Sequence, residues 1–203
     1  MKRIAKLLLC SMLFFALALV GTGCGEKGTD AGSTLQESST LHHVAIDVEG
    51  YGTISLELDE EIAPITVENF LTLAEAGFYD DLTFHRIIDG FMIQGGDPLG
   101  SGIGGSDEII TGEFAANGIE NDLSHTRGVI SMARAKDYDS ASSQFFIVQQ
   151  DSTFLDGNYA AFGYVTDGMD IVDELCADTP VQDTNGTVAA EDQPVITAIR
   201  VID

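Results

Sequence analysis

Positively charged residues are scarce in this 203-residue chain, which has 9 Lys and Arg against 33 Asp and Glu and a formal net charge of −24. Because nucleic acids and anionic membranes bind proteins through clustered cations, this balance excludes both as electrostatic partners. The charge does not indicate disorder, since 44% of the residues are hydrophobic and 11 Phe and 5 Tyr supply core material. The length fits one domain, or one domain with a tail.

Cysteine and histidine are too few for the sites usually built from them. Of the three Cys, Cys10 and Cys24 lie near the N-terminus, so we expect no intrachain disulfide. The four His lack metal-ligand spacing, and we predict neither a metal site nor a cofactor. Residues 97–107 are rich in Gly but lack the Lys of a phosphate loop and the alternating Asp of a calcium loop, which favours a surface loop. Cys176 lies on the apolar side of a helical segment and is expected in the core.

Long apolar runs are absent except near the N-terminus. There, three cations precede an apolar run from Leu7 to Val20, which has the length of a signal-peptide core and is short for a bilayer span. The small-residue segment that follows ends at Cys24 and resembles the lipobox of bacterial lipoproteins, in which this cysteine carries the lipid. Gly21 departs from the lipobox pattern, where Leu is usual, so an ordinary secretory signal is the alternative.

The chain therefore divides into three parts. We predict a lipoprotein-type signal peptide over residues 1–23, a flexible tether over 24–40 and a folded domain over 41–203. Loss of the signal removes three cations and changes the net charge to −27. We expect an exported protein that is held at the bacterial cell membrane only through acyl chains such as palmitate on Cys24, with a secreted form as the alternative.

Alternating apolar and polar residues predict a domain that is mainly β. Two segments have a helical period: one begins at Pro64 and stops at Gly77, and the other runs from Met169 to Ala177. Many strands with two amphipathic helices predict an antiparallel barrel or sandwich whose open ends the helices cover. The predicted strands are 43–48, 53–58, 84–88, 91–94, 128–132, 144–149, 161–165 and 194–202.

Four sequence blocks combine apolar residues with a few polar ones: Phe84–Asp97, Ile130–Ala135, Ser143–Ile147 and Phe154–Gly163. In this order and at this spacing, they resemble the signature of the cyclophilin-type peptidyl-prolyl isomerases. The similarity extends from about Val44 to the C-terminus. This resemblance implies an eight-stranded antiparallel closed β-barrel capped by two α-helices, and it implies a monomer that isomerises X-Pro bonds in unfolded or folding exported proteins.

Isomerisation of an X-Pro bond needs neither a nucleophile nor a proton acceptor. Rotation breaks the amide resonance, with a barrier of about 18–20 kcal/mol, and the twisted prolyl nitrogen is more basic. A fixed cation that donates to this nitrogen stabilises the twisted state more than either planar state. By the resemblance, Arg86 is this catalytic cation, and Gln94 steadies it. A surface arginine paired with one of the many acids is the alternative interpretation of Arg86.

The resemblance also implies which residues bind the substrate. Three of them depart from the best-known pattern: Phe154 replaces a Trp, Tyr159 replaces a His, and Arg134 replaces an Asn. Phe154 lacks an indole N–H, so we expect weak binding of the inhibitor cyclosporin with catalysis retained. The implied substrate-binding residues are Phe91, Met92, Ala133, Arg134, Gln144, Phe146, Phe154, Leu155 and Tyr159.

Two other functions remain open from the sequence. The first is a non-catalytic module that grips proline-containing peptides without accelerating their rotation. The second is a solute-binding or adhesive lipoprotein that uses a small barrel, which would need no proline pocket. Arg86 and Gln94 favour the enzyme over both.

Overall fold

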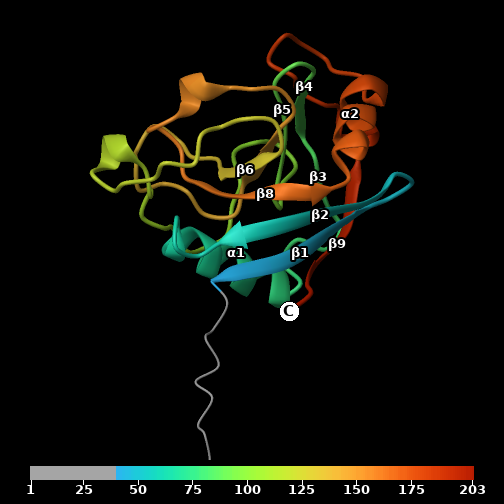
Figure 1. The fold of residues 1–203 in the computed structure, drawn as a ribbon. Helices are drawn as coiled ribbons and strands as arrows, with labels where there is room; N and C mark the ends of the chain where they lie inside the picture. The colour runs from blue at the N-terminus through green and yellow to red at the C-terminus, as the bar shows by residue number, and fades with distance from the viewer. Residues whose placement is uncertain (1–39) are drawn as a thin grey trace, which may run out of the picture. The chain divides into compact units, whose positions relative to one another are not determined.

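The computed structural model describes residues 40–203, which form a curled β-sheet with two helices (Figure 1). The predictions for the signal segment, for Cys24 and for the tether up to residue 39 lie outside the described residues. The helices are α1 (Pro64–Glu75) and α2 (Met169–Asp178). The strands are β1 (Leu41–Val48), β2 (Gly52–Asp59), β3 (Leu82–Thr83), β4 (Arg86–Ile88), β5 (Met92–Gly95), β6 (Val129–Met132), β7 (Phe145–Val148), β8 (Ala161–Asp167) and β9 (Val195–Val201).

These nine strands form one antiparallel sheet in the order β3-β9-β1-β2-β8-β6-β7-β5-β4. The prediction of a mainly β domain with two helices is confirmed, and both helices begin at the predicted residue. Eight strands match the predicted segments. The ninth, β3, has two residues, which is too short for an alternating pattern.

The prediction of a closed eight-stranded barrel is wrong, because a loop occupies the edge where closure would occur. The Ile87 N–H donates to the Gly186 carbonyl at 2.8 Å, and the Val188 N–H donates to the His85 carbonyl at 3.1 Å. These contacts fill the outer edge of β4, while β3 pairs with β9. Within residues 40–203, β3 and β4 therefore do not pair, and the sheet is curled but open.

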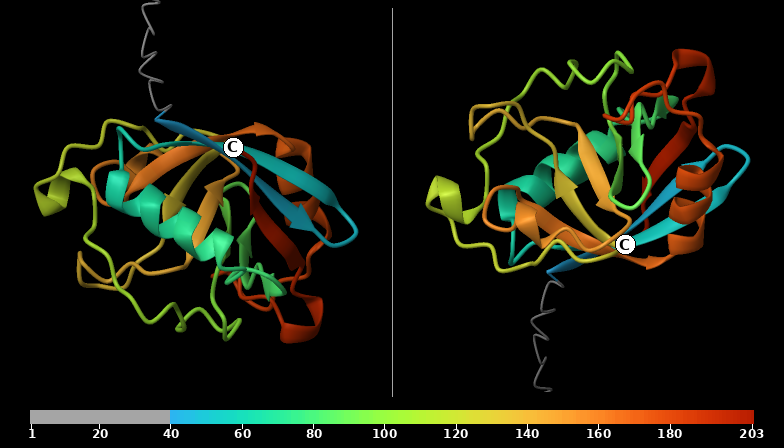
Figure 2. Two further views of the ribbon diagram at one scale, coloured as in Figure 1. Left: turned by 90° about the horizontal axis from the view of Figure 1, so that it is seen from below. Right: turned by 90° about the horizontal axis from the view of Figure 1, so that it is seen from above.

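The main hydrophobic core lies inside the curled sheet, where both helices contribute their apolar faces. Figure 2 shows α1 lying across the sheet, with α2 at a different edge of it. Cys176 belongs to this core, as predicted, and burial raises the pKa of its thiol to about 12, which keeps it protonated and unreactive. The buried helix residues are Thr66, Val67, Phe70, Ala74, Val172, Leu175 and Cys176.

The N-terminus of α1 is capped by a distant carboxylate. Ala63, at the usual capping position, has no side chain that can accept a hydrogen bond. Glu113 takes this role from a loop: its buried carboxylate accepts the backbone N–H of Ile65 at 3.1 Å and of Thr66 at 2.8 Å, and the Thr66 hydroxyl at 2.6 Å. A negative charge at this end also interacts favourably with the positive end of the helix dipole. The loop and the helix are thus held together by one side chain.

Replacing Glu113 with Ala should lower the free energy of unfolding by about 2 kcal/mol, because it leaves the end of α1 without acceptors in a buried place. Urea denaturation followed by far-UV circular dichroism measures this change. Glu120→Ala is the matched control, since Glu120 is an exposed acid seven residues away. Equal stability of the two variants would contradict the capping role.

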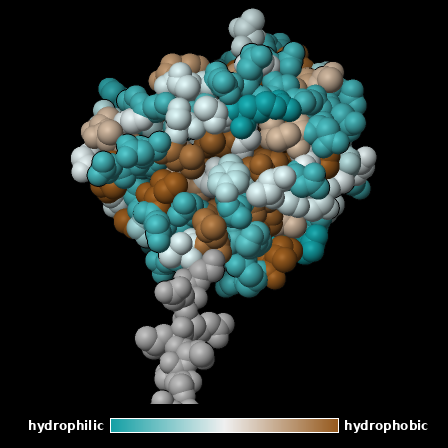
Figure 3. All heavy atoms as spheres, in the orientation of Figure 1, coloured by the Kyte–Doolittle hydropathy of each residue, from teal (hydrophilic) through white to brown (hydrophobic). Residues whose placement is uncertain are grey.

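The surface of the domain is mixed in polarity. On the face shown in Figure 3, hydrophilic residues surround apolar ones that gather near the centre. Among the large hydrophobic side chains of residues 40–203, several are widely exposed, with Phe154 at 71% and Ile103 at 87%. Both line cavities described below.

Candidate functional site

A row of side chains crosses four neighbouring strands on the face of the sheet turned away from the main core. In the strand register Arg86 of β4 lies opposite Gln94 of β5, Gln94 opposite Phe146 of β7, and Phe146 opposite Ser131 of β6. Side chains directly opposite one another share a face and lie about 5 Å apart. The row therefore places the cation, the amide and an aromatic ring side by side.

Alternation along the same strands explains why their sequences are apolar throughout. In β7, Phe145 and Ile147 point into the main core, while Phe146 and Val148 point outward into a second apolar cluster. This second cluster is the base of the site. Its buried members are Met92, Val129, Phe146, Val148, Leu155 and Ala161, and partly buried residues packed on it include Phe91, Ala133 and Tyr159.

Three hydrogen bonds to oxygen atoms fix the Arg86 guanidinium, and its Nη1 also donates to the Met92 sulfur at 4.0 Å. Its Nη1 donates to Gln94 Oε1 at 3.0 Å, its Nε donates to the Asn185 carbonyl at 2.8 Å, and its Nη2 donates to Asn185 Oδ1 at 3.4 Å. Burial lowers the pKa of Arg86, and Tyr159 and Asp183 oppose this shift. Because the ordinary pKa of a guanidinium lies far above neutral, Arg86 still carries its charge at neutral pH. The interpretation of Arg86 as a surface arginine paired with an acid does not fit, because no carboxylate between residues 40 and 203 lies within ion-pair distance of it.

Gln94 is itself held by a relay of amides. Its Nε2 donates to Gln144 Oε1 at 2.9 Å, and Gln144 Nε2 donates to the Gly104 carbonyl at 2.7 Å. These bonds fix which way the Gln94 amide points, so that its oxygen faces Arg86. The glycine-rich loop over 97–107 is therefore tied to the site, and the Asp97 carboxylate orders this loop by accepting the N–H groups of Leu99 and Gly102.

The loop that contains Asn185 is shaped by its neighbours. Asp183 accepts the backbone N–H groups of Asn185 at 2.9 Å and Thr187 at 3.1 Å, which closes a tight turn. Gly186 has φ of +80°, and a Cβ added there would lie 2.2 Å from the Ile87 carbonyl oxygen. Only glycine allows the loop to approach β4 this closely. This approach brings the Asn185 carbonyl to Arg86.

A cavity of about 530 Å³ lies over this row. One part is apolar, with Phe146 and Leu155 buried below and the exposed Phe154 ring packed on Phe91 at 5.6 Å between ring centroids. Arg86 lies at the side of the cavity. Ten of the eleven predicted catalytic and substrate-binding residues line this cavity: Arg86, Phe91, Met92, Gln94, Ala133, Arg134, Phe146, Phe154, Leu155 and Tyr159.

A second cavity of about 400 Å³ adjoins the first. Gln144, the eleventh predicted residue, lines it, together with serines and backbone of the glycine-rich loop. Gln94, Gly102, Ala133 and Arg134 line both cavities, so the two are parts of one cleft. The structure thus brings all eleven predicted residues together.

Sequence reasoning missed five residues that line the first cavity, Gly102 among them. Asn185 and Thr187 line the first cavity from a loop about a hundred residues after Arg86, and nothing in the local sequence connects them to it. His85 and Ser101 also line it. His85 is buried, and burial lowers its pKa, so that the imidazole is neutral at neutral pH. Its place next to Arg86 in a strand-like run indicated only a structural residue.

A buried histidine supports the apolar part of the cavity from behind. The His125 ring stacks on Phe146 with 6.0 Å between centroids and 14° between planes. Its Nδ1 pairs with Asp156 at 2.9 Å and its Nε2 with the Ser131 hydroxyl at 3.0 Å. Because Asp156 follows Leu155 in the chain, this network fixes two walls of the cavity at once.

The described residues show no sign of metal chemistry or of a membrane span. No three His, Cys, Asp or Glu side chains between residues 40 and 203 come together as a metal site would require. Neither helix in this part of the chain is long and apolar enough to cross a bilayer.

Comparison with known proteins identifies relatives of this chain. Residues 43–201 match the family model described as cyclophilin type peptidyl-prolyl cis-trans isomerase/CLD. The chain is 47% identical over 125 residues to peptidyl-prolyl cis-trans isomerase-like 1 of Rhizopus delemar, which covers 61% of this chain and 74% of that protein. It is 40% identical over 146 residues to peptidyl-prolyl cis-trans isomerase A of Dickeya dadantii, which covers 68% of this chain and 73% of that protein.

Solved structures agree with the sequence matches. A crystal structure of a Cryptosporidium parvum cyclophilin type peptidyl-prolyl cis-trans isomerase superposes with a TM-score of 0.71 at 32% identity, covering 80% of this chain and 98% of that one. A second crystal structure of that enzyme, in the presence of the dipeptide Ala-Pro, gives a TM-score of 0.70 at 32% identity, covering 79% of this chain and 99% of that one.

Proposed function

The chain belongs to the cyclophilin-type peptidyl-prolyl cis-trans isomerases and is an isomerase of X-Pro bonds, and from this premise we propose that Arg86 is its catalytic residue. The observation that supports this role is a guanidinium held by Gln94 and Asn185 at the side of an apolar cavity. In this proposal the proline ring enters between Phe146, Leu155 and the Phe91–Phe154 pair.

Rotation about the X-Pro bond breaks no covalent bond, so the enzyme acts by differential stabilisation. As the amide twists, the prolyl nitrogen becomes pyramidal and accepts a hydrogen bond that the planar amide nitrogen does not accept. Gln94 and Asn185 accept three of the five N–H groups of Arg86 and the Met92 sulfur accepts a fourth, which leaves one for the substrate. A donor fixed in advance and partly shielded from water costs no reorganisation during the reaction.

Catalysis by residues 41–203 is tested directly with an Ala-Pro peptide. Exchange spectroscopy by NMR should show that the purified domain makes cis/trans interconversion much faster than the uncatalysed process, which takes tens to hundreds of seconds. Peptide binding without acceleration would contradict the catalytic role and favour a binding module. The structure with Ala-Pro present was obtained for the Cryptosporidium parvum relative, and it supports a proline-containing peptide as the ligand here.

We propose further that the enzyme acts as a monomer on exported proteins, anchored by a lipid on Cys24. The lipobox-like segment before Cys24 and the tether after it support this location, and a cleft formed by one chain supports the monomer. Mass spectrometry of the mature N-terminus tests the anchor: a diacylglyceryl group on Cys24 supports it. A free N-terminus at another residue would contradict the anchor and favour the secreted form.

A further inference from the structure

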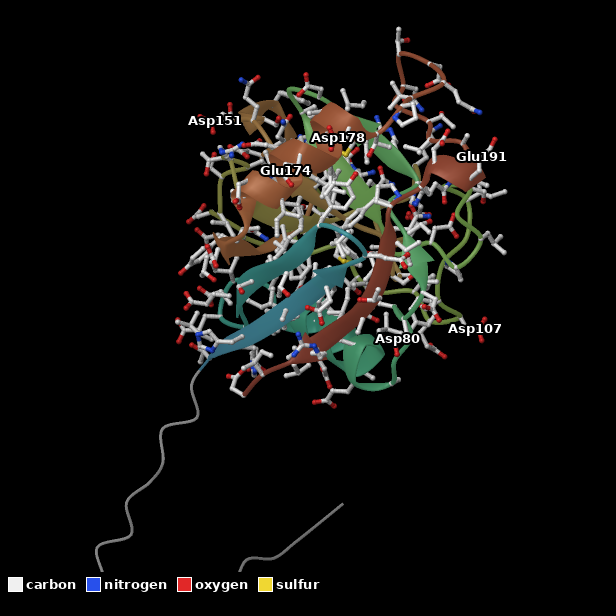
Figure 4. The ribbon with its side chains drawn as sticks, turned by 90° about the vertical axis from the view of Figure 1, so that its right-hand side faces the viewer. Asp80, Asp107, Asp151, Glu174, Asp178 and Glu191 are labelled. Carbon is white, nitrogen blue, oxygen red and sulfur yellow. The ribbon has the colours of Figure 1, made fainter. Side chains whose placement is uncertain are left out.

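The distribution of charge around the cleft differs from that of the rest of the domain. Residues 41–203 contain 30 Asp and Glu but five Lys and Arg. Figure 4 shows acids such as Asp80, Asp107, Asp151, Glu174, Asp178 and Glu191 spread over one side of the molecule, on several elements. The residues between 40 and 203 that line the two cavities of the cleft include two arginines and no Asp or Glu.

The arginines outside the cleft have carboxylate partners, and those inside it do not. Arg127 pairs with Asp173 at 2.7 Å, and Arg200 pairs with Asp47 at 2.7 Å. Neither Arg86 nor Arg134 has an ion pair with any described residue. In so acidic a domain, two arginines without partners mark a place that can accept a carboxylate from outside. Arg86 is already assigned to the prolyl nitrogen, so Arg134 is the cation available for another group.

Arg134 is held in a fixed position by three aromatic rings. Its guanidinium carbon lies 5.1 Å from the ring centroid of Phe114, 5.0 Å from that of Tyr138 and 4.7 Å from that of Tyr159. Contacts of this kind are attractive for a cation and restrict its motion. Because the ring of Tyr159 also contacts Phe146 edge-on, Arg134 is fixed relative to the floor of the proline cavity.

The hydrogen bonds of Arg134 leave some of its guanidinium N–H groups without an acceptor. Its Nε and Nη2 donate to the Asn158 carbonyl at 3.0 and 2.8 Å, and its Nη1 donates to the Ala135 carbonyl at 3.0 Å. These are its hydrogen bonds within residues 40–203, so one N–H on each terminal nitrogen remains. A carboxylate can accept hydrogen bonds from such unused guanidinium N–H groups.

We propose that Arg134 makes this isomerase selective for prolyl peptides with an Asp or Glu side chain next to the X-Pro unit. The second cavity, lined by small polar residues such as Ser106, Ser140 and Ser142, receives that side chain while the proline occupies the first. The selectivity rests on the proposed function, since it assumes that the proline binds in the first cavity. It adds a substrate class to that function: acidic segments of a client chain.

The test compares three peptides that differ in one side chain. Glu, Gln or Lys is placed directly before an Ala-Pro pair, and a second set places it directly after the proline, with kcat/KM measured by NMR exchange on the purified full chain. In one of the two sets the Glu peptide should be preferred over the Gln peptide by about threefold to fivefold, the range of a half-exposed ion pair. The preference should fall as NaCl is raised, because salt screens the pair.

Arg134→Gln should reduce the ratio of kcat/KM for Glu over Gln to about one, and Arg134→Lys should retain part of it. Arg200→Gln is the matched control, since it removes the same charge from the domain at a residue outside the cleft and should leave the ratio unchanged. Lys136→Gln removes the nearest exposed cation along the chain and should also leave the ratio unchanged.

Other outcomes separate the two proposals. Equal rates for Glu, Gln and Lys peptides in both sets would overturn the selectivity and leave the isomerase function intact. A preference that survives Arg134→Gln but disappears in Lys136→Gln or Arg200→Gln would overturn the role of Arg134. Failure to accelerate any of the peptides would instead contradict the catalytic proposal itself.

Discussion

Arg86→Ala lowers kcat/KM for an Ala-Pro peptide by about 100-fold to 1000-fold, the range measured when one preorganised donor is removed from an active site. The loss follows because the charged donor to the prolyl nitrogen is gone while the apolar cavity remains. Binding of the planar peptide should change little, so the loss should appear in kcat rather than in KM. NMR exchange at several peptide concentrations measures both.

Two controls separate this result from unfolding. Arg86→Lys keeps a positive charge but lacks the planar guanidinium that donates to Gln94 and Asn185, so its kcat should also fall, by a smaller factor. Arg200→Ala removes a cation bound to Asp47 and should keep full activity. If Arg86→Ala retained the rate of the unaltered enzyme, with all three variants equally stable, Arg86 would not be the catalytic residue.

Gly186→Ala should lower both stability and activity. The added Cβ would lie 2.2 Å from the Ile87 carbonyl oxygen and 2.5 Å from Ile88 Cγ1, at a φ that side chains rarely adopt. We expect the free energy of unfolding to fall by roughly 2–3 kcal/mol. Displacement of Asn185 would also free the Arg86 guanidinium, and a misplaced catalytic group should cost about 10-fold to 100-fold in kcat.

Gly50→Ala is the control for Gly186→Ala. Gly50 has a similar φ of +77°, but nothing lies within 4 Å of an added Cβ. Gly50→Ala should therefore introduce backbone strain without a steric clash. We expect its free energy of unfolding to fall by about 1 kcal/mol and its kcat to stay unchanged. Thermal denaturation and NMR exchange on both variants provide the comparison. Equal activity of the two variants would mean that the loop contact does not position Arg86.

Part of the site could be predicted from the sequence because its residues are close along the chain. Asp89 and Gly90 lie between two short apolar segments, which predicts a second strand pair or a bend. The structure has the strand pair, and its register places Arg86 opposite Gln94. The first residue of α1 could also be predicted, because proline is favoured in the first turn of a helix and Pro64 lies there. Local rules therefore find the main elements, whereas the roles of Arg86 and Gln94 came from the resemblance to the family.

Other parts depend on contacts between distant segments, and no local rule reaches them. Asn185 contacts Arg86 across 99 residues, and Glu113 caps a helix that begins 49 residues earlier. The same limit explains the error about closure, because the loop around Gly186 occupies the edge of β4 at which the resemblance implied that the barrel closes. Arg134 was recognised as a departure from the family pattern, but its three aromatic neighbours come from three separate segments.

The row that starts at Arg86 has a consequence for how the enzyme becomes active. Each neighbour in the row belongs to a different strand, and the last support of Arg86 comes from Asn185, near the C-terminus. A ribosome that has released fewer than about 185 residues therefore holds a chain without a working site. Since β5 and β6 reach each other only through β7, which follows both in the chain, the cleft forms late, and non-local pairings of this kind are slow. Recovery of turnover during refolding should thus report completion of the whole sheet.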